Sequence, residues 1–172
     1  MYIQFMAKHI PLPSQEYLRE LYDYDAETGQ LIRKTYRNSQ TVIGEVCGHV
    51  KADGYRDVVI DSRQYYASRI IWMWVTGDDP GEHYVDHIDR DRDNNRWSNL
   101  RLADRPQQMW NRKLPGKGYS FDKQRGMWAV RFYVRGKRIF GGRFAVERDA
   151  AAAAIELRAQ YHGEFAGSFA SA

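Results

Sequence analysis

Hydrophobic and polar residues alternate along this chain in short runs, which predicts an α+β protein built from small helices and strands. The first such element is a helix over 15–22, where Ser14 is a plausible N-cap. Tyr17, Leu18 and Leu21 lie on one side of it, because residues three and four apart share a helix face. The chain therefore starts with a short amphipathic helix.

Strand-length segments separated by turn residues follow this helix. A turn at 25–29 precedes a strand, and Asp-Gly and Asp-Ser pairs separate the later ones, which lie at 44–51, 55–60 and 64–67. The apolar run RIIWMWV then predicts a helix over 69–75, with Ser68 as its cap and Gly77 as its end. Trp72 and Trp74 cannot face the same way on such a helix. We expect a small α+β scaffold over this half.

The second half of the sequence divides into two segments. Two short strands flank a long polar loop within 84–113, and Asp104 and Pro106 are well placed to start a helix that runs to Lys113. Three strands are expected at 118–123, 127–135 and 137–144, followed by an alanine-rich helix over 146–161. We therefore expect two domains, 1–113 and 118–172, joined by a linker at 114–117.

Length and composition restrict the class of protein. With 172 residues, of which 43% are hydrophobic, the chain is long enough for one compact domain or two small ones. The single cysteine, Cys47, excludes an internal disulfide and a thiolate zinc site. No apolar run is long enough to cross a bilayer, and the first ten residues do not resemble a signal peptide. We expect a cytoplasmic protein that is neither secreted nor bound to a membrane.

Positive charge is concentrated in the second half of the chain. The net charge is +4, and residues 112–143 hold ten Lys and Arg against one acid, Asp122. Aromatic residues are interleaved with these cations, which is typical of a nucleic-acid surface, whereas a solvated face that keeps the protein soluble is the alternative. On the strand at 127–135, alternation places Arg131, Tyr133 and Arg135 on one face. The opposite face is apolar and suited to cover the final helix; its residues are Trp128, Val130, Phe132 and Val134.

The polar loop region combines groups suited to phosphodiester hydrolysis. That reaction needs a base to activate water and a cation to stabilise the developing charge. His87 follows Asp86 at the end of an expected strand, and Gln108 and Asn111 lie three apart on the next helix, so both can face that strand. Carboxylate and amide oxygens suit magnesium or manganese rather than zinc.

The stretch DHIDRDRDNNRWSNLR resembles the HNH endonucleases, in particular the cysteine-free phage and homing-type branch. The resemblance implies a ββα-metal fold that holds one divalent ion, Mg2+ or alternatively Mn2+, without structural zinc. It implies that His87 is the general base, that Asp86 is a metal ligand, and that Asn99 orients the histidine and holds the loop. The third position of the pattern falls on Gln108, with Asn111 one turn further, so the second protein ligand is one of these two.

Each of these residues also has a structural interpretation. His87 could be a buried histidine satisfied by hydrogen bonds, and Asp86 could cap or turn the chain. The aspartates of the loop could be solvated; a calcium loop is less suitable, since the glycine at its sixth position and its terminal glutamate are missing. Arg96 could pair with one of these aspartates or hold a phosphate.

The last segment resembles the AP2 domain, a DNA-binding fold of three antiparallel strands packed on one helix. The matching pieces are GYSFDKQRGMWAVRFYVRGKRIFGGRF and ERDAAAAAIELRAQYHGEFA. This resemblance implies contacts to double-stranded DNA from the exposed sheet residues and the first hairpin. Together with neighbouring cations, the predicted DNA-binding residues are Arg96, Arg112, Lys117, Lys123, Arg125, Arg131, Tyr133, Arg135, Arg138 and Arg143. Arg148 and Arg158, on the final helix, are expected to be solvated or paired within it.

The sequence as a whole predicts a metal-dependent DNA endonuclease of the homing or free-standing phage type, without a small-molecule cofactor. Nicking and double-strand cleavage both stay open, as do a monomer and a homodimer. The main alternative is a DNA-binding regulator that kept the HNH shape without turnover, since Gln108 departs from the family pattern. A structural or packaging accessory of a virion is a third alternative.

Overall fold

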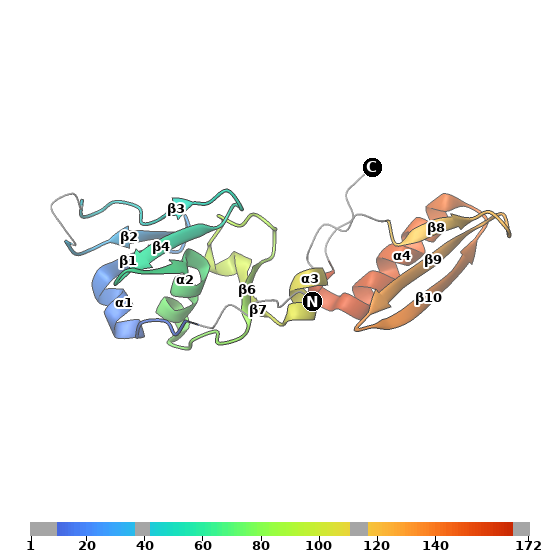
Figure 1. The fold of residues 1–172 in the computed structure, drawn as a ribbon. Coiled ribbons are helices and arrows are strands. Elements are labelled where there is room, and N and C mark those ends of the chain that lie inside the picture. Colours follow the sequence, from blue (N-terminus) through green and yellow to red (C-terminus); the bar gives the residue numbers. More distant parts are fainter. Residues whose placement is uncertain (1–9, 37–41, 111–116, 167–172) are drawn as a thin grey trace. The chain divides into compact units, whose positions relative to one another are not determined.

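The computed structural model describes residues 10–36, 42–110 and 117–166, and the chain divides into two compact units, Met1–Asp104 and Arg105–Ala172 (Figure 1). This division comes before the domain end predicted at 113. Most of the predicted linker at 114–117 lies outside the described residues, so the linker stays a prediction. Each unit is described by itself below.

The first unit begins with the predicted helix, α1 (Gln15–Leu21), and Ser14 caps it by accepting a hydrogen bond from the Tyr17 amide at 3.3 Å. The chain then forms a hairpin of β1 (Tyr22–Asp25) and β2 (Gln30–Arg33). The predicted turn and the strand after it are confirmed. The strand before the turn was not predicted, because its sequence, YDYD, has no apolar alternation.

A three-stranded antiparallel sheet, in the order β3-β4-β5, follows the hairpin. Its strands are β3 (His49–Val50), β4 (Arg56–Ile60) and β5 (Arg63–Tyr66). The strand predicted at 44–51 is much shorter in the structure, because Gly44 and Gly48 have positive φ angles and interrupt the extended backbone.

Helix α2 (Ala67–Thr76) continues directly from β5, and Gly77 ends it in the left-handed conformation, as predicted. The prediction that Ser68 caps this helix is wrong. The N-cap is Tyr66, without a side-chain capping bond, and Ser68 is buried one residue inside the helix. The helix starts early because β5 leads straight into it without an intervening loop.

The core of the first unit lies between α1, α2 and the small sheets. Leu18, Leu31, Ile70 and Ile71 are fully buried there. Each such side chain contributes roughly 1.5–3 kcal/mol through its removal from water. Trp72 packs on Trp97 and Trp74 on Tyr24, which confirms that the two tryptophans of α2 point in different directions.

The polar loop is enclosed by a hairpin of the first unit, as predicted. β6 (Tyr84–His87) pairs antiparallel with β7 (Leu100–Ala103), and the loop between them ends in a 3-10 turn, η1 (Trp97–Asn99). This hairpin determines where the candidate site forms.

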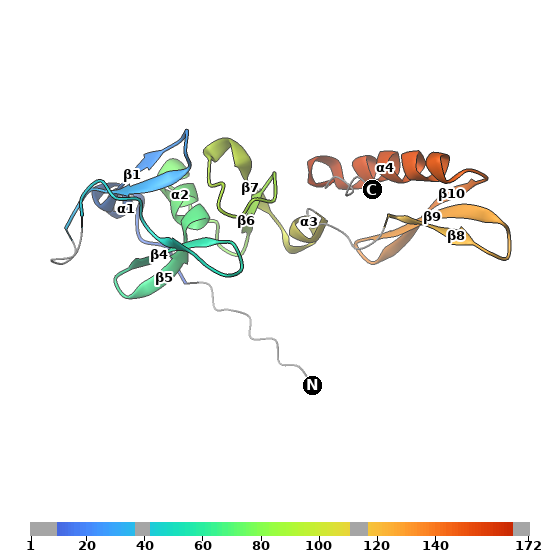
Figure 2. The same ribbon diagram turned by 90° about the horizontal axis from the view of Figure 1, so that it is seen from above.

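The second unit starts with α3 (Arg105–Trp110), and the predicted three strands and final helix follow. They are β8 (Tyr119–Asp122), β9 (Met127–Val134), β10 (Lys137–Phe144) and α4 (Glu147–His162), with a 3-10 turn, η2 (Gly163–Phe165), after them. The antiparallel sheet has the order β10-β9-β8, and α4 lies along one of its faces (Figure 2).

Close packing of α4 on this sheet requires a glycine in β10. A Cβ at Gly141 would overlap Leu157 of α4 and come within 2.8 Å of Val130. The predicted strands and helix are therefore confirmed, while the likeness to the AP2 domain stays a prediction. Among the described residues, none of the helices is both long and apolar enough to cross a membrane.

Candidate functional site

The β6–β7 hairpin places the Asp86–His87 pair at the end of a strand. Asp86 lies opposite Arg101 and His87 opposite Leu100 in the register. Both side chains are buried, with 8% of Asp86 and 3% of His87 exposed. Polar groups that are buried to this extent need hydrogen-bond partners, and strand β7 and the loop supply them.

The imidazole of His87 is held by an asparagine that the sequence analysis did not single out. Its Nε2 lies 3.0 Å from Oδ1 of Asn95. The Asn95 amide is oriented because its Nδ2 donates to the backbone carbonyl of Asp93 at 3.1 Å, so the oxygen faces the ring. Nε2 therefore donates, and a neutral ring carries its lone pair on Nδ1.

Asn99 performs one of the two roles predicted for it. Its side chain accepts from the Asp89 amide at 3.0 Å and donates to Oδ1 of Asp89 at 2.9 Å and to the Asn94 carbonyl at 2.8 Å. It therefore holds the loop. The residue whose side chain contacts His87 is Asn95 instead, because Asn99 lies at the end of η1 and faces the start of the loop.

Hydrogen bonds also fix the first acid of the loop. Burial alone would raise the pKa of Asp89, but hydrogen bonds from Asn94 and Asn99 outweigh it and hold this pKa below its ordinary value. Asp89 is therefore a carboxylate at neutral pH and acts as an acceptor that closes the loop. Asp89 holds the loop through these hydrogen bonds and is also exposed to solvent, which agrees with the solvated alternative for the acidic run.

Asp86 is paired with a cation from the neighbouring strand. Nε and Nη2 of Arg101 lie 3.1 and 3.0 Å from Oδ2 of Asp86, and both side chains are buried. The sequence analysis missed Arg101; the cross-strand register of the expected hairpin is the signal that could have found it. This ion pair gives the buried Asp86 side chain a cationic partner next to His87.

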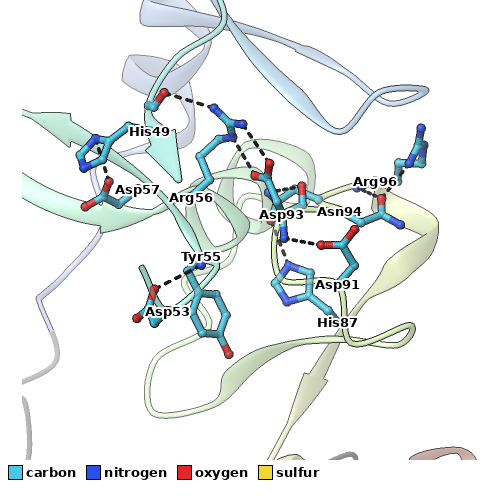
Figure 3. Close-up of polar contacts among 12 residues, drawn as sticks. His49, Asp53, Tyr55, Arg56, Asp57, His87, Asp91, Asp93, Asn94 and Arg96 are labelled. Atoms are coloured by element: carbon cyan, nitrogen blue, oxygen red, sulfur yellow. Dashed lines mark hydrogen bonds and ion pairs between the residues drawn. The ribbon is translucent and has the colours of Figure 1, made fainter. Parts of the chain in front are cut away.

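Two distant segments hold the loop from outside. The Tyr24 hydroxyl donates to the Asn95 carbonyl at 3.0 Å, and the hairpin turn at Gly29 packs directly on the Asn95–Arg96 backbone. Arg56 makes a bidentate ion pair with Asp93, with distances of 2.8 and 2.9 Å (Figure 3). The β1–β2 hairpin and β4 thus determine the position of the residue that contacts His87.

Aromatic packing encloses the histidine on another side. The rings of Tyr55 and His87 lie 5.9 Å apart, and the guanidinium of Arg92 lies 4.7 Å from the centre of the Tyr55 ring. Burial, opposed by Arg92, raises the pKa of the Tyr55 hydroxyl, so this group is neutral and can donate a proton in a hydrogen bond.

The structure does not test the predicted set of metal ligands. Asp86 belongs to the first unit and Gln108 to α3 of the second, and Asn111 and Arg112 lie outside the described residues. In the part of the chain that the structure describes, no three His, Cys, Asp or Glu side chains gather as a metal-binding group. The assignments of Gln108 and Asn111 stay predictions.

The predicted DNA-binding residues fall into two groups. Arg96 lies in the loop of the first unit, where it donates to the Glu27 carbonyl and to Oδ1 of Asn94 rather than to an aspartate. In the second unit, Lys117 pairs with Glu147 at 3.3 Å, and Asp122 lies 3.3 Å from Arg125 and 3.6 Å from Arg131. Lys123 is exposed.

The face of the sheet away from α4 carries most of the second group. Tyr133 is 67% exposed and lies opposite Arg138, and Arg143 covers the ring of Phe140 at 5.0 Å. The apolar face with Trp128, Val130 and Phe132 packs against α4, as predicted. Of the two alternatives for Arg158, solvated or paired within α4, the first is wrong, because Arg158 is buried and donates to the Trp110 carbonyl at 3.3 Å.

Comparison with known proteins agrees with this geometry. Residues 65–109 match the HNH endonuclease family, and this match includes α2 and the β6–β7 hairpin with its loop. Protein 3.8 of Escherichia phage T7 is 35% identical over 103 residues, which cover 56% of this chain and 84% of the phage protein. No solved structure matches. The chain belongs to the family of phage T7 protein 3.8 and carries an HNH endonuclease domain at residues 65–109.

Proposed function

We propose that this protein is a metal-dependent DNA endonuclease in which His87 takes the proton from the attacking water. The observation that carries the proposal is the Asp86–His87 pair at the end of β6, inside the segment that matches the HNH family. Because Asn95 accepts from Nε2, the basic nitrogen of the ring is Nδ1. A general base of this kind is worth a factor of roughly 100 to 10,000 in rate.

The oxygen donors near His87 are compatible with a Mg2+ ion that is held partly by the protein and partly by substrate and water. Mg2+ is commonly held by one or two carboxylates together with substrate phosphates and water. Asp86 offers a hard oxygen, although its Oδ2 already accepts from Arg101. Asp86 with Gln108 or Asn111 would hold the ion, and Mn2+ would fit the same donors. When bound, the ion would stabilise charge on the scissile phosphate.

The loop residues are proposed to keep the base in place during the reaction. Asn95 fixes the rotation of the imidazole, and Arg56, through Asp93, fixes the segment that presents Asn95. Such support matters because a displacement of about 1 Å at a reacting group can lower the rate roughly 100-fold.

The second unit is proposed to bind the duplex through the sheet face that α4 leaves uncovered. Arg138, Arg143 and Tyr133 are exposed on that face, and a sheet of this kind fits the major groove of DNA. This arrangement supports the AP2-like mode of binding, in which arginines contact phosphates or guanine edges. The charge also attracts the phosphate backbone from a distance.

Plasmid nicking tests the proposed chemistry. The parent and His87→Ala are compared on supercoiled plasmid with Mg2+, with His83→Ala as a control, since His83 is an exposed histidine of the same segment. We expect His87→Ala to reduce the rate of nicking by about 100-fold or more, and His83→Ala to leave it unchanged. Undiminished nicking by a folded His87→Ala protein would exclude this role.

A DNA-binding regulator without turnover is the second candidate function. The buried Asp86–Arg101 ion pair favours it, because one carboxylate oxygen of the expected metal ligand is already engaged by a cation. In this case the parent protein would bind duplex DNA but would nick it in neither Mg2+ nor Mn2+. The same plasmid assay, combined with a gel-shift assay, distinguishes the two functions.

A further inference from the structure

The second unit contains a cavity that the proposed chemistry does not use. Its volume is about 430 Å3, within the range of small-ligand sites, and it is formed by α3, α4 and the β9–β10 turn. Its lining is mostly apolar and aromatic, with Trp110, Phe132 and Tyr133 among its walls. A cavity of this kind suits a flat, unsaturated ring.

A histidine with unmet hydrogen-bonding capacity lines this cavity. His162 stacks on Trp110, with ring centres 4.5 Å apart and planes at 8°, and its side chain is only 6% exposed. Within the described residues, neither Nδ1 nor Nε2 has a hydrogen-bond partner. Buried polar groups are almost always partnered, so this ring requires an explanation.

Packing alone does not explain the imidazole. A phenylalanine would stack on Trp110 equally well and would bury no polar atom. Burial, and to a smaller extent Arg158, lowers the pKa of His162, so the ring is neutral at neutral pH. A neutral imidazole offers one donor and one acceptor side by side. A ligand whose edge presents both kinds of group would satisfy it.

The charge at this cavity selects an anionic ligand. Three arginines line it, Arg105, Arg135 and Arg158, and no Asp or Glu does so among the described residues. A nucleotide combines these requirements, since it has a flat base, an edge with donors and acceptors, and a phosphate.

We propose that this cavity binds one unstacked base of a DNA strand, which packs against the aromatic wall formed by Phe132 and presents its edge to His162. The inference rests on the proposed DNA binding of the second unit and deepens it. Arg105, which is exposed at the cavity, would hold an adjoining phosphate. Packing of a base on an aromatic side chain tolerates any sequence, so the cavity would add affinity without requiring one base.

The test compares two probes of equal charge in EDTA, where no cleavage occurs. One is a fluorescein-labelled oligodeoxythymidylate, and the other is an oligonucleotide of the same length made of abasic sites. We expect the parent to bind the first about 5- to 100-fold more tightly, as expected for one stacked base. His162→Phe should lose most of this preference. Tyr161→Leu is the control, since Tyr161 is an exposed aromatic of α4 that does not line the cavity.

His162→Phe separates a ligand contact from a structural role. It keeps the stack on Trp110 and removes two unpaired nitrogens, so its melting temperature should equal or exceed that of the parent. An unchanged preference in a folded His162→Phe protein would overturn the proposal, as would equal binding of both probes by the parent. Failure of the parent to bind either probe or duplex would instead contradict the proposed function.

Discussion

The two units of this protein differ in how far the polar side chains of their proposed functional regions are exposed to solvent. In the first unit, Asp86, His87, Asn95 and Arg101 are buried, and each has a hydrogen-bond or ion-pair partner. In the second, the cations of the uncovered sheet face are exposed, as Arg138 and its neighbours show. Buried, partnered groups keep a fixed geometry, whereas exposed ones adapt to a partner at little cost.

The apolar core of each unit holds its functional side chains in place in a different way. The first unit has a large apolar core, with Leu18, Tyr22 and Ile70 among twelve buried members, and it supports a polar loop that must stay in one position. Among the described residues of the second unit, the core cluster between sheet and helix has three buried members, Val130, Ala150 and Ala154, and α4 packs closely on the sheet there. The comparison supports the proposal that the chemistry belongs to the first unit and DNA binding to the second.

The largest expected effect comes from removing the buried cation of the first unit. Arg101→Met leaves the Asp86 carboxylate buried and unpaired, which should lower the free energy of unfolding of this unit by roughly 3–5 kcal/mol. Urea denaturation followed by circular dichroism measures this change. Arg138→Met is the matched control, because Arg138 is exposed and its loss should change stability by less than about 0.5 kcal/mol.

A double variant shows whether the effect comes from the unpaired charge. Arg101→Met combined with Asp86→Leu removes both charges and should recover most of the lost stability, since an apolar pair of similar volume can replace a buried ion pair. If the double variant were as unstable as Arg101→Met, lost packing of the arginine chain would be the cause, and the contrast between the units would lose this support.

Two glycines should respond differently in the two units. Gly29 has a φ of 76°, and an added Cβ would lie 2.5 Å from the Arg96 nitrogen and 2.6 Å from the Asn95 carbonyl carbon. Gly29→Ala must therefore shift the backbone that presents Asn95 to His87. We expect nicking to fall about 100-fold, with a loss of roughly 1–3 kcal/mol in stability.

Gly141→Ala is the counterpart in the second unit. It overpacks α4 against β10 and should cost a similar roughly 1–3 kcal/mol. Its main functional effect should be weaker DNA binding, measured as a dissociation constant in EDTA, with the nicking rate at saturating DNA unchanged. Equal loss of that rate in both variants would show that catalysis and DNA binding are not separated between the two units.

Much of the fold could be predicted from the sequence, because its elements follow local rules. Ser14 and Gly77 delimit helices as expected, and alternation along 127–135 identified the face that α4 covers. The error at Ser68 arose because a serine before an apolar run is an ordinary capping signal. Here the strand β5 leads into the helix directly, and tertiary packing buries that serine instead.

The candidate site could be predicted only in part. Asp86 and His87 were found because they are adjacent in sequence and end a strand. Asn95 and Arg101 were missed because their contacts depend on how the loop folds back and on cross-strand register, which a linear pattern does not report. Gln108 and Asn111 stay predictions, since Gln108 belongs to the other unit and Asn111 lies outside the described residues.

The smallest expected effect concerns a single exposed charge of the second unit. If Arg138 neutralises one phosphate, Arg138→Ala should reduce the slope of log affinity against log salt by about 0.9, because one fewer counterion is released. Arg148→Ala removes the same charge from α4, where the Arg148 side chain is 89% exposed and lies on the covered side of the sheet. Titrations of duplex DNA over a salt series should leave the Arg148→Ala slope unchanged. Equal slopes for both variants would mean that DNA responds to net charge and not to the uncovered face, and the division between a fixed catalytic unit and an adaptable binding face would no longer hold.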